Sequence, residues 1–349
     1  MKFRTLPGTK VQVSEIGFGL WTVSTGWWGT YTEGEAISLM HKALDLGITL
    51  YDAADTYGNG YSEELIARAF PKQRDQIVIA TKVGYNFYDH GNERRGQREI
   101  PQDFSVPFIR TAVEKALKRL NTDHIDILQL HNIRMEQVED DALWTLLDQL
   151  VKEGKILAHG AALGPAIGWL YEGVDCVQRR RPQILQHIYN LLEPHPGRQI
   201  MDEGGATNDA AHPVRTRYLI RVPHSSGMLE GKYTKDTVFP PNDHRSHRPR
   251  SWLLNGVKKI ETLQFLAGPD RTLGQAALQW LLADARIASC LPNIYDEGQL
   301  REFAAAPESP ALTPEELQRI EELTRGNFGV EAETPNYKGT MTREVATAS

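Results

Sequence analysis

Short apolar runs alternate with amphipathic segments along most of the chain. The runs that read as strands lie near residues 15–19, 48–51, 77–82, 125–130, 156–160, 184–188, 217–222 and 286–291. Between them, apolar residues recur every three or four positions, as in Ile109, Val113, Ala116 and Leu120, which is typical of helices with one buried face. Strands that are apolar throughout and joined by helices predict a parallel sheet covered by helices.

The boundaries of several helices are also readable. Ser62 is expected to be the N-cap of a helix whose first turn carries Glu63 and Glu64, where the helix dipole favours acids. A last helix begins with the capping box Thr313-Pro314-Glu315-Glu316. The link 191–215 is rich in proline and glycine, which predicts a short or broken helix. Further helices are expected near 33–46, 143–151, 166–180, 252–267, 272–284 and 297–306.

Strand–helix units repeated over about 310 residues predict a (β/α)₈ barrel, preceded by a hairpin over residues 1–13. A doubly wound sheet is the alternative, but no Gly-x-Gly-x-x-Gly follows the first strand. Because no linker rich in Pro, Gly and Ser divides the chain, residues 1–325 are expected to form one domain. The polar residues 326–349 are expected to form an extended tail.

The composition narrows the class of protein. The 349 residues are 40% hydrophobic and 24% charged with a net charge of −6, so no basic surface for nucleic acid or anionic membrane is expected. No apolar run is long enough to span a bilayer, and the start lacks a signal-peptide core. The two cysteines, Cys176 and Cys290, predict neither a disulfide framework nor a metal site. We expect a cytoplasmic protein without a metal, and leave homo-oligomer formation open.

Candidate chemistry lies at the ends of three consecutive strands. Asp52, Lys82 and His131 end the second, third and fourth strands, and Tyr57 lies in the loop after Asp52. In a barrel these four meet at one mouth. A lysine beside a tyrosine favours the phenolate, and an aspartate can hold the lysine. His131 could then orient a carbonyl oxygen while Tyr57 gives or takes a proton. Any one of these residues alone is more often structural.

The sequence resembles the aldo-keto reductases over residues 1–325. The resemblance rests on motifs along the chain: Tyr51-Asp52 … Tyr57-Gly58 … Ser62-Glu63, Ala80-Thr81-Lys82, Leu130-His131-Asn132, Gly154-Lys155-Ile156, Gly227-Met228-Leu229-Glu230-Gly231-Lys232-Tyr233 and Gln275-Ala276-Ala277-Leu278-Gln279-Trp280. It implies a (β/α)₈ barrel closed at its base by an N-terminal hairpin. It also implies reduction of aldehydes and ketones with NADPH by the tetrad Asp52, Tyr57, Lys82 and His131.

The same resemblance implies a set of cofactor contacts, but several positions depart from the family pattern. The implied set is Gln186, Arg221, Pro223, Ser225, Gly227, Leu229, Lys232, Asn293, Tyr295 and Gln299. Where the family has Gly-Val-Ser-Asn after the fifth strand, this chain has Gly160-Ala161-Ala162-Leu163, so two side chains that hold the nicotinamide carboxamide are absent. Arg221 stands where an aromatic residue often stacks on the nicotinamide.

The residues expected near the 2′-phosphate of NADPH also depart from the family pattern. Tyr295 replaces a polar or basic residue, Asp296 and Glu297 follow it, and Phe303 replaces an adenine-binding Asn. Carboxylates repel a phosphate dianion. One interpretation is a redox enzyme that uses NAD(H), or holds NADP(H) by other contacts. A second is a non-redox enzyme, with the tetrad serving isomerisation or dehydration. A third is a non-catalytic regulatory member, against which the intact tetrad argues.

The expected substrate is a small carbonyl or sugar-like molecule. Trp21, Trp27 and Trp28 after the first strand, together with Tyr85, His244 and Arg245, are expected to line its pocket. The loop 240–250 carries three arginines and two histidines, so the substrate could be anionic; alternatively these cations pair with the protein's own acids. A metal site at His244 and His247 lacks identifiable further ligands.

Overall fold

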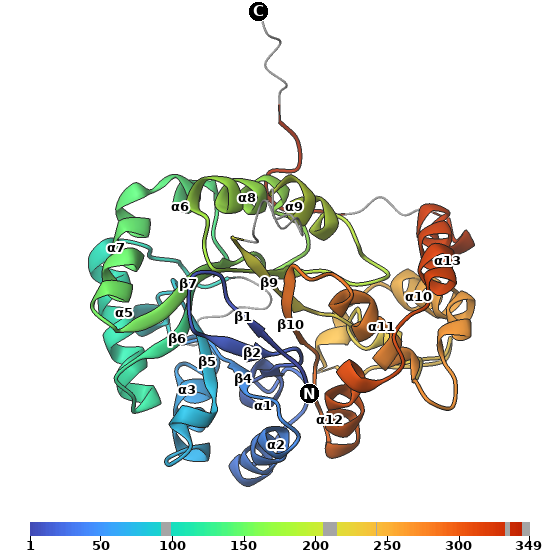
Figure 1. Ribbon diagram of the computed structural model, residues 1–349, viewed down its shortest axis with the longest axis horizontal. Coiled ribbons are helices and arrows are strands. Elements are labelled where there is room, and N and C mark those ends of the chain that lie inside the picture. Colours follow the sequence, from blue (N-terminus) through green and yellow to red (C-terminus); the bar gives the residue numbers. More distant parts are fainter. Residues whose placement is uncertain (92–98, 205–214, 242, 332–335, 344–349) are drawn as a thin grey trace, which may run out of the picture.

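The computed structural model describes residues 1–91, 99–204, 215–241, 243–331 and 336–343. Eight parallel strands pair in chain order from β3 to β10. The chain just before β3 also pairs with β10: Gly17 N donates to Cys290 O, and Cys290 N donates to Glu15 O, both at 2.9 Å. The sheet therefore closes on itself, with helices around its rim (Figure 1). The predicted (β/α)₈ barrel is confirmed, and the doubly wound sheet is excluded.

The predicted strands all form and overlap their expected ranges; the largest difference is at β3, which begins three residues later than expected. The barrel strands are β3 (Phe18–Gly19), β4 (Leu50–Asp52), β5 (Val78–Val83), β6 (Ile125–His131), β7 (Ile156–Ala162), β8 (Ile184–Ile188), β9 (Arg217–Arg221) and β10 (Ile287–Leu291). The α-helices are α1 (Trp21–Ser24), α2 (Glu33–Asp45), α3 (Tyr61–Ala69), α4 (Phe87–His90), α5 (Val106–Leu120), α6 (Met135–Glu139), α7 (Asp141–Lys152), α8 (Leu170–Asp175), α9 (Gly197–Glu203), α10 (Arg250–Thr262), α11 (Leu273–Leu282), α12 (Glu297–Ala304) and α13 (Pro314–Arg325).

Two predicted helix features have different outcomes. The capping box at Thr313 is confirmed, because its side chain accepts from Glu316 N at the start of α13. Ser62 is not the N-cap of α3, which is a correction. Gly60 takes that place with a left-handed backbone, while the Ser62 hydroxyl donates to Ala54 O at 2.9 Å. The short helix expected in the link 191–215 is α9, and residues 205–214 lie outside the described part.

The hairpin of β1 (Phe3–Thr5) and β2 (Gln12–Ser14) closes one end of the barrel, lying across the centre of the strand ring in Figure 1. Its apolar side chains pack on inward-facing residues of the strands, which together are Leu6, Val11, Val13, Leu50, Ala80, Ile127, Ala158, Ile184, Leu219, Ala288 and Leu291. Side chains two positions further along a strand return to the same face. An apolar floor therefore lies directly below the inward-facing polar residues.

The end of the chain returns to the barrel. Residues 336–343, which we call the C-terminal strap, pair with the segment before α8. Trp169 N donates to Lys338 O at 2.7 Å, and Lys338 N donates to Ile167 O at 3.1 Å. The Glu172 carboxylate accepts from both the backbone N–H and the hydroxyl of Thr340. Residues 332–335 and 344–349 of the expected tail lie outside the described part, and a domain boundary at residue 325 stays a prediction.

The helices within these described ranges include none that is long and apolar enough to cross a membrane. Cys176 and Cys290 are both buried and unpaired, packed where the apolar pattern puts them.

Candidate active site

The loop after β4 is fixed to the neighbouring strand, which brings the signature residues together. Ala53 N donates to Ala80 O at 2.8 Å, and Asp55 N donates to Lys82 O at 3.1 Å. The turn that follows is closed by Tyr57 N, which donates to Ala54 O at 3.0 Å. The ends of β4, β5 and β6 are adjacent in the sheet. Asp52, Tyr57, Lys82 and His131 therefore share one mouth, as the sequence predicts.

Lys82 is the buried centre of this group. Its side chain is 1% exposed, and Nζ donates to Asp52 Oδ2 at 2.7 Å and to Ala53 O at 2.8 Å. Nζ also lies 5.1 Å from the Tyr57 ring centroid and interacts electrostatically with Tyr57. Burial alone would lower the pKa of Lys82, but Asp52 and Tyr57 outweigh it, so the pKa lies above its ordinary value. Lys82 is thus a charged group at physiological pH.

Two glutamines hold the second oxygen of Asp52. Gln129 Nε2 donates to Oδ1 at 3.3 Å, and Gln186 Nε2 donates to it at 3.1 Å. A buried carboxylate with a cation and two amide donors is well compensated. Sequence reasoning missed Gln129, although its place two residues before His131 on an inward-facing strand was a usable signal. Gln186, expected at the nicotinamide carboxamide, is engaged with Asp52 in this structure.

Aromatic rings pack around the Tyr57 ring and its neighbours. The Tyr57 ring meets His131 edge-on at 5.8 Å and Trp21 edge-on at 5.0 Å. Trp27 stacks on Trp21 at 6.4 Å, and Tyr85 meets His131 at 4.9 Å. Rings in this arrangement form an apolar wall around one acid–base group. The structure therefore brings Trp21, Trp27 and Tyr85 to the mouth where the sequence puts the substrate.

The turn that carries His131 is braced from outside. Gln102 Nε2 donates to the carbonyls of His131 and Asn132 at 2.9 and 3.1 Å. Asn132 Nδ2 donates to the Tyr85 hydroxyl at 2.8 Å, and that hydroxyl also contacts Glu99. Arg134 donates to Asn132 O at 2.5 Å and to Glu99 Oε2 at 2.9 Å. These bonds hold the backbone of the turn that carries His131 in place.

A buried acidic cluster lies behind the signature loop. Glu63 is fully buried and accepts from Arg119 Nε and from Thr81 Oγ1, at 2.6 Å each. It therefore forms a buried ion pair in addition to its place in the first turn of α3. Asp55 is fully buried too, and neither carboxylate oxygen has a side-chain partner among the described residues. Burial raises the pKa of Asp55 well above its usual range, and the charge of Glu63 adds to this. Sequence reasoning missed this cluster.

The turn after β9 holds several residues expected at the cofactor. Ser225 and Gly227 have left-handed backbones, with φ of +47° and +91°. The Ser225 hydroxyl donates to Glu193 Oε2 at 2.9 Å. Leu229 is fully buried, whereas the Lys232 side chain is 58% exposed and lies 3.6 Å from Glu230. Pro223 is buried in the same turn. Lys232 is therefore the residue of this turn whose charge is exposed to solvent.

The loop before α12 is built around Tyr295 and Gln299. Gln299 is 4% exposed: Oε1 accepts from Tyr295 N at 2.8 Å, and Nε2 donates to Glu230 Oε2 at 2.7 Å. Asp296 caps α12 by accepting from Gln299 N at 2.8 Å. Tyr295 borders a hollow of about 390 Å³ whose lining is Tyr31, Gly34, Glu35, Ser38, Leu39, Lys42 and Tyr295. Asn293 Oδ1 accepts a long bond of 3.4 Å from the Thr22 hydroxyl.

The loop 240–250 folds onto the loop after β3. His244 N donates to Trp27 O at 3.1 Å, and its ring stacks on Trp28 at 5.6 Å. Arg245 pairs with Asp243 through two bonds of 2.8 and 2.5 Å. Its guanidinium also lies 4.9 Å from the Trp28 ring and 5.6 Å from the Tyr295 ring. The charge of Arg245 is therefore compensated by Asp243. Position 242 lies outside the described part.

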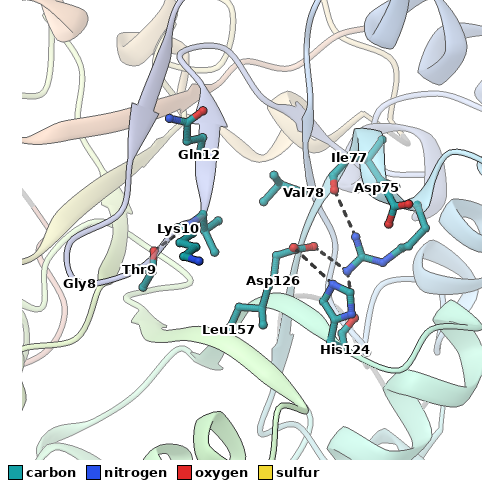
Figure 2. Close-up of a pocket in the computed structure, with 12 residues that line it drawn as sticks. Gly8, Thr9, Lys10, Gln12, Asp75, Ile77, Val78, His124, Asp126 and Leu157 are labelled. Carbon is teal, nitrogen blue, oxygen red and sulfur yellow. Dashed lines mark hydrogen bonds and ion pairs between the residues drawn. The ribbon is translucent and has the colours of Figure 1, made fainter.

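A wider hollow lies at the opposite end of the barrel. It measures about 730 Å³ and is lined by Gly8, Thr9, Lys10, Val11, Gln12, Arg74, Asp75, Ile77, Val78, His124, Asp126 and Leu157. Arg74 Nη2 donates to Asp126 Oδ2 at 2.8 Å. Figure 2 shows Asp126 and His124 on one side of the hollow, and Lys10 and Gln12 of the hairpin on the other. Arg74 also donates to His124 O at 3.0 Å. Barrel enzymes work at the carboxyl ends of their strands, so this hollow belongs to the stabilising face.

No group of three or more metal-ligating side chains occurs within the described ranges.

The class of this protein follows from its similarity to known proteins. The model of the aldo/keto reductase family matches residues 15–325, and the chain belongs to that family. "Aldo-keto reductase YhdN" of Bacillus subtilis is 30% identical over 310 residues, covering 86% of this chain and 87% of that protein.

Two further relatives bear on function. "NADH-specific methylglyoxal reductase" of Escherichia coli is 28% identical, covering 88% of this chain and 93% of that protein. The holo form of aldo-keto reductase AKR11C1 from Bacillus halodurans has a TM-score of 0.71 and 26% identity, covering 93% of this chain and 96% of the other. The chain is thus an oxidoreductase of a family that acts on carbonyl groups.

Proposed function

We propose that this chain interconverts an aldehyde or ketone and its alcohol with a nicotinamide cofactor, through Asp52, Tyr57, Lys82 and His131. The observation that carries the proposal is the buried Lys82 ammonium, which bonds Asp52 and lies 5.1 Å from the centroid of the Tyr57 ring. A charged lysine held against a tyrosine hydroxyl favours proton transfer from that hydroxyl. Regulatory or structural roles make no use of such an arrangement.

The side chains divide the chemistry among them. Tyr57 gives its proton to the carbonyl oxygen as negative charge develops there, and Lys82 stabilises the phenolate that remains. His131 orients the carbonyl oxygen, while Asp52 keeps Lys82 charged and in place. When bound, the reduced nicotinamide supplies the hydride that reaches the carbonyl carbon. In the direction of oxidation, the Tyr57 phenolate takes the proton of the alcohol.

The side chains expected at the cofactor fit NAD(H) more readily than NADP(H), which carries an additional 2′-phosphate. Lys232 and the turn around Gly227 would hold its phosphates. The hollow beside Tyr295 would hold the adenosine end, but there Lys42 pairs with Glu297, and Arg301 pairs with the same Glu297 at 2.6 Å. The negative charge of Glu297, with that of Asp296 beside it in the sequence, opposes the binding of a phosphate dianion here. We therefore propose NAD(H) as the preferred cofactor.

Titration of the purified protein with NADH, NADPH and their oxidised forms tests this proposal, with binding followed by calorimetry. Tighter binding of NADH than NADPH supports it. Equal or tighter binding of NADPH removes the cofactor preference and leaves the reaction in place. If none of the four binds at millimolar concentration, the redox function itself is rejected, and turnover of a carbonyl compound without nicotinamide would then favour the non-redox interpretation.

A further inference from the structure

Arg221 reaches across the barrel mouth from the end of β9. Its Nη2 donates to Leu163 O at 2.8 Å and to Pro165 O at 3.0 Å, in the loop after β7. Gly164 lies between these two acceptors with φ of +156°, and a Cβ there would overlap Nη2. The absence of a side chain at this glycine is therefore what lets the guanidinium lie at the mouth.

Among the described residues, acceptors engage one nitrogen of this guanidinium, Nη2. Within the described residues, Nε and Nη1 of Arg221 donate to no acceptor, and no carboxylate lies within ion-pair distance. The neighbouring arginines differ, because Arg134 pairs with Glu99 and Arg245 pairs with Asp243. A partly buried guanidinium without a counter-ion is unfavourable, and an anionic ligand would relieve that cost.

Arg221 lies beside the turn that carries His131, because a Cβ on Gly164 would meet both Arg221 Nη2 and Asn132 Oδ1. It interacts electrostatically with Tyr57, Asp52 and Tyr85. Asp52 is already committed to Lys82. An anion bound to the free nitrogens of Arg221 would therefore lie at the mouth that holds Tyr57 and His131. A guanidinium binds carboxylate and phosphate oxygens in a fixed planar geometry, so it would also orient the molecule that carries them.

We propose that Arg221 binds an anionic oxygen group, a carboxylate or a phosphate, on the carbonyl substrate. The assignment of the bound molecule as substrate rests on the proposed function; the binding itself does not. It differs from the expectation that the arginines of the loop 240–250 meet an anionic substrate, because Arg245 is neutralised by Asp243. It also gives Arg221 a role other than the cofactor contact that the family resemblance implies.

Binding is tested first with compounds that cannot be reduced. Calorimetry would compare oxamate with acetamide, and glycerol 3-phosphate with glycerol, in the presence and absence of NADH. One anion is expected to bind the unmodified protein and to bind Arg221→Met about 10-fold or more weakly. Arg110→Met is the matched control, because Arg110 of α5 forms an exposed surface pair with Glu153. Binding of oxamate would identify the group as a carboxylate, and binding of glycerol 3-phosphate would identify it as a phosphate.

Turnover provides the second test. Glyoxylate is compared with methylglyoxal, and glyceraldehyde 3-phosphate with glyceraldehyde. The anionic member of one pair should have the higher kcat/KM, and Arg221→Met should remove that preference, mainly through KM, while Arg221→Lys restores part of it. The affinities for NADH and NADPH should stay within about 3-fold.

Three results would overturn the proposal: no anion binds the unmodified protein, Arg221→Met weakens neutral and anionic members alike, or it weakens NADH itself about 10-fold. The last result would make Arg221 a cofactor residue. Because oxamate and glycerol 3-phosphate binding needs no hydride transfer, a protein that binds them through Arg221 but reduces nothing would retain this inference and lose the proposed function. Melting curves of each variant exclude misfolding as the cause.

Discussion

Lys82 Nζ and Asp52 Oδ2 lie 2.7 Å apart inside the barrel, with side chains only 1% and 7% exposed. Removing one partner of such a buried pair leaves the other charge uncompensated. We expect Asp52→Asn to lower the free energy of unfolding by about 3 kcal/mol, measured by denaturant titration. Glu153→Gln, which breaks the exposed pair with Arg110, is the control and should have little effect. Similar losses in both variants would contradict a special role of the buried pair.

Loss of the Tyr57 hydroxyl should affect catalysis and leave folding intact. Tyr57→Phe removes the proton donor while keeping the ring that packs on Trp21 and His131. We expect kcat to fall about 100-fold or more, with the affinity for NADH unchanged. Steady-state kinetics and calorimetry measure the two quantities. Tyr61→Phe, which loses a hydroxyl at the edge of α3, should keep its activity; full activity of Tyr57→Phe would reject the tetrad mechanism.

The buried Asp55 carboxyl should make stability depend on pH. Its pKa in the folded protein lies above the ordinary value of about 3.9, so it favours the folded state at low pH and this contribution is lost as the pH rises. Asp55→Asn removes that loss. The variant should therefore be more stable than the unmodified protein at about pH 8, with a difference that shrinks towards about pH 4.

Urea titrations at several pH values would measure this difference, and each unit of pKa shift corresponds to about 1.4 kcal/mol. Glu64→Gln, on the exposed face of α3, is the matched control and should show no such trend. A variant that is less stable than the unmodified protein at neutral pH would show that Asp55 is ionised and paired.

The C-terminal strap packs so closely on Gly168 that there is no room for a side chain at this position. A Cβ on Gly168 would overlap Lys338 O, at a backbone φ of +137°. We expect Gly168→Ala to detach residues 336–343, seen as faster hydrogen exchange of the Trp169 and Lys338 amides. Gly26 also has a positive φ, of +73°, but open space around it, so Gly26→Ala should leave this exchange unchanged. Equal exchange in both variants would mean that the strap tolerates the added carbon.

Much of the fold follows from local signals. The alternation of apolar strands and one-faced helices requires burial on both sides of a parallel sheet, which leaves few architectures. Asp52, Lys82 and His131 could be grouped from sequence because the ends of adjacent parallel strands meet at one edge. The start of α3 could not be read this way. Ser62 has the chemistry of an N-cap, but tertiary structure offers its hydroxyl a better acceptor in Ala54 O.

The partners of each charged side chain were decided only by the tertiary structure. The family resemblance puts Arg221 at the cofactor and the loop 240–250 suggests Arg245 for an anionic substrate, yet packing places Asp243 against Arg245 and leaves Arg221 without an ion-pair partner among the described residues. It presents Gln186 as a cofactor residue, yet the barrel interior places it against Asp52. Periodicity acts between residues close in sequence and so determines elements and their order. Charge compensation acts between residues brought together by the barrel, and no local pattern encodes it.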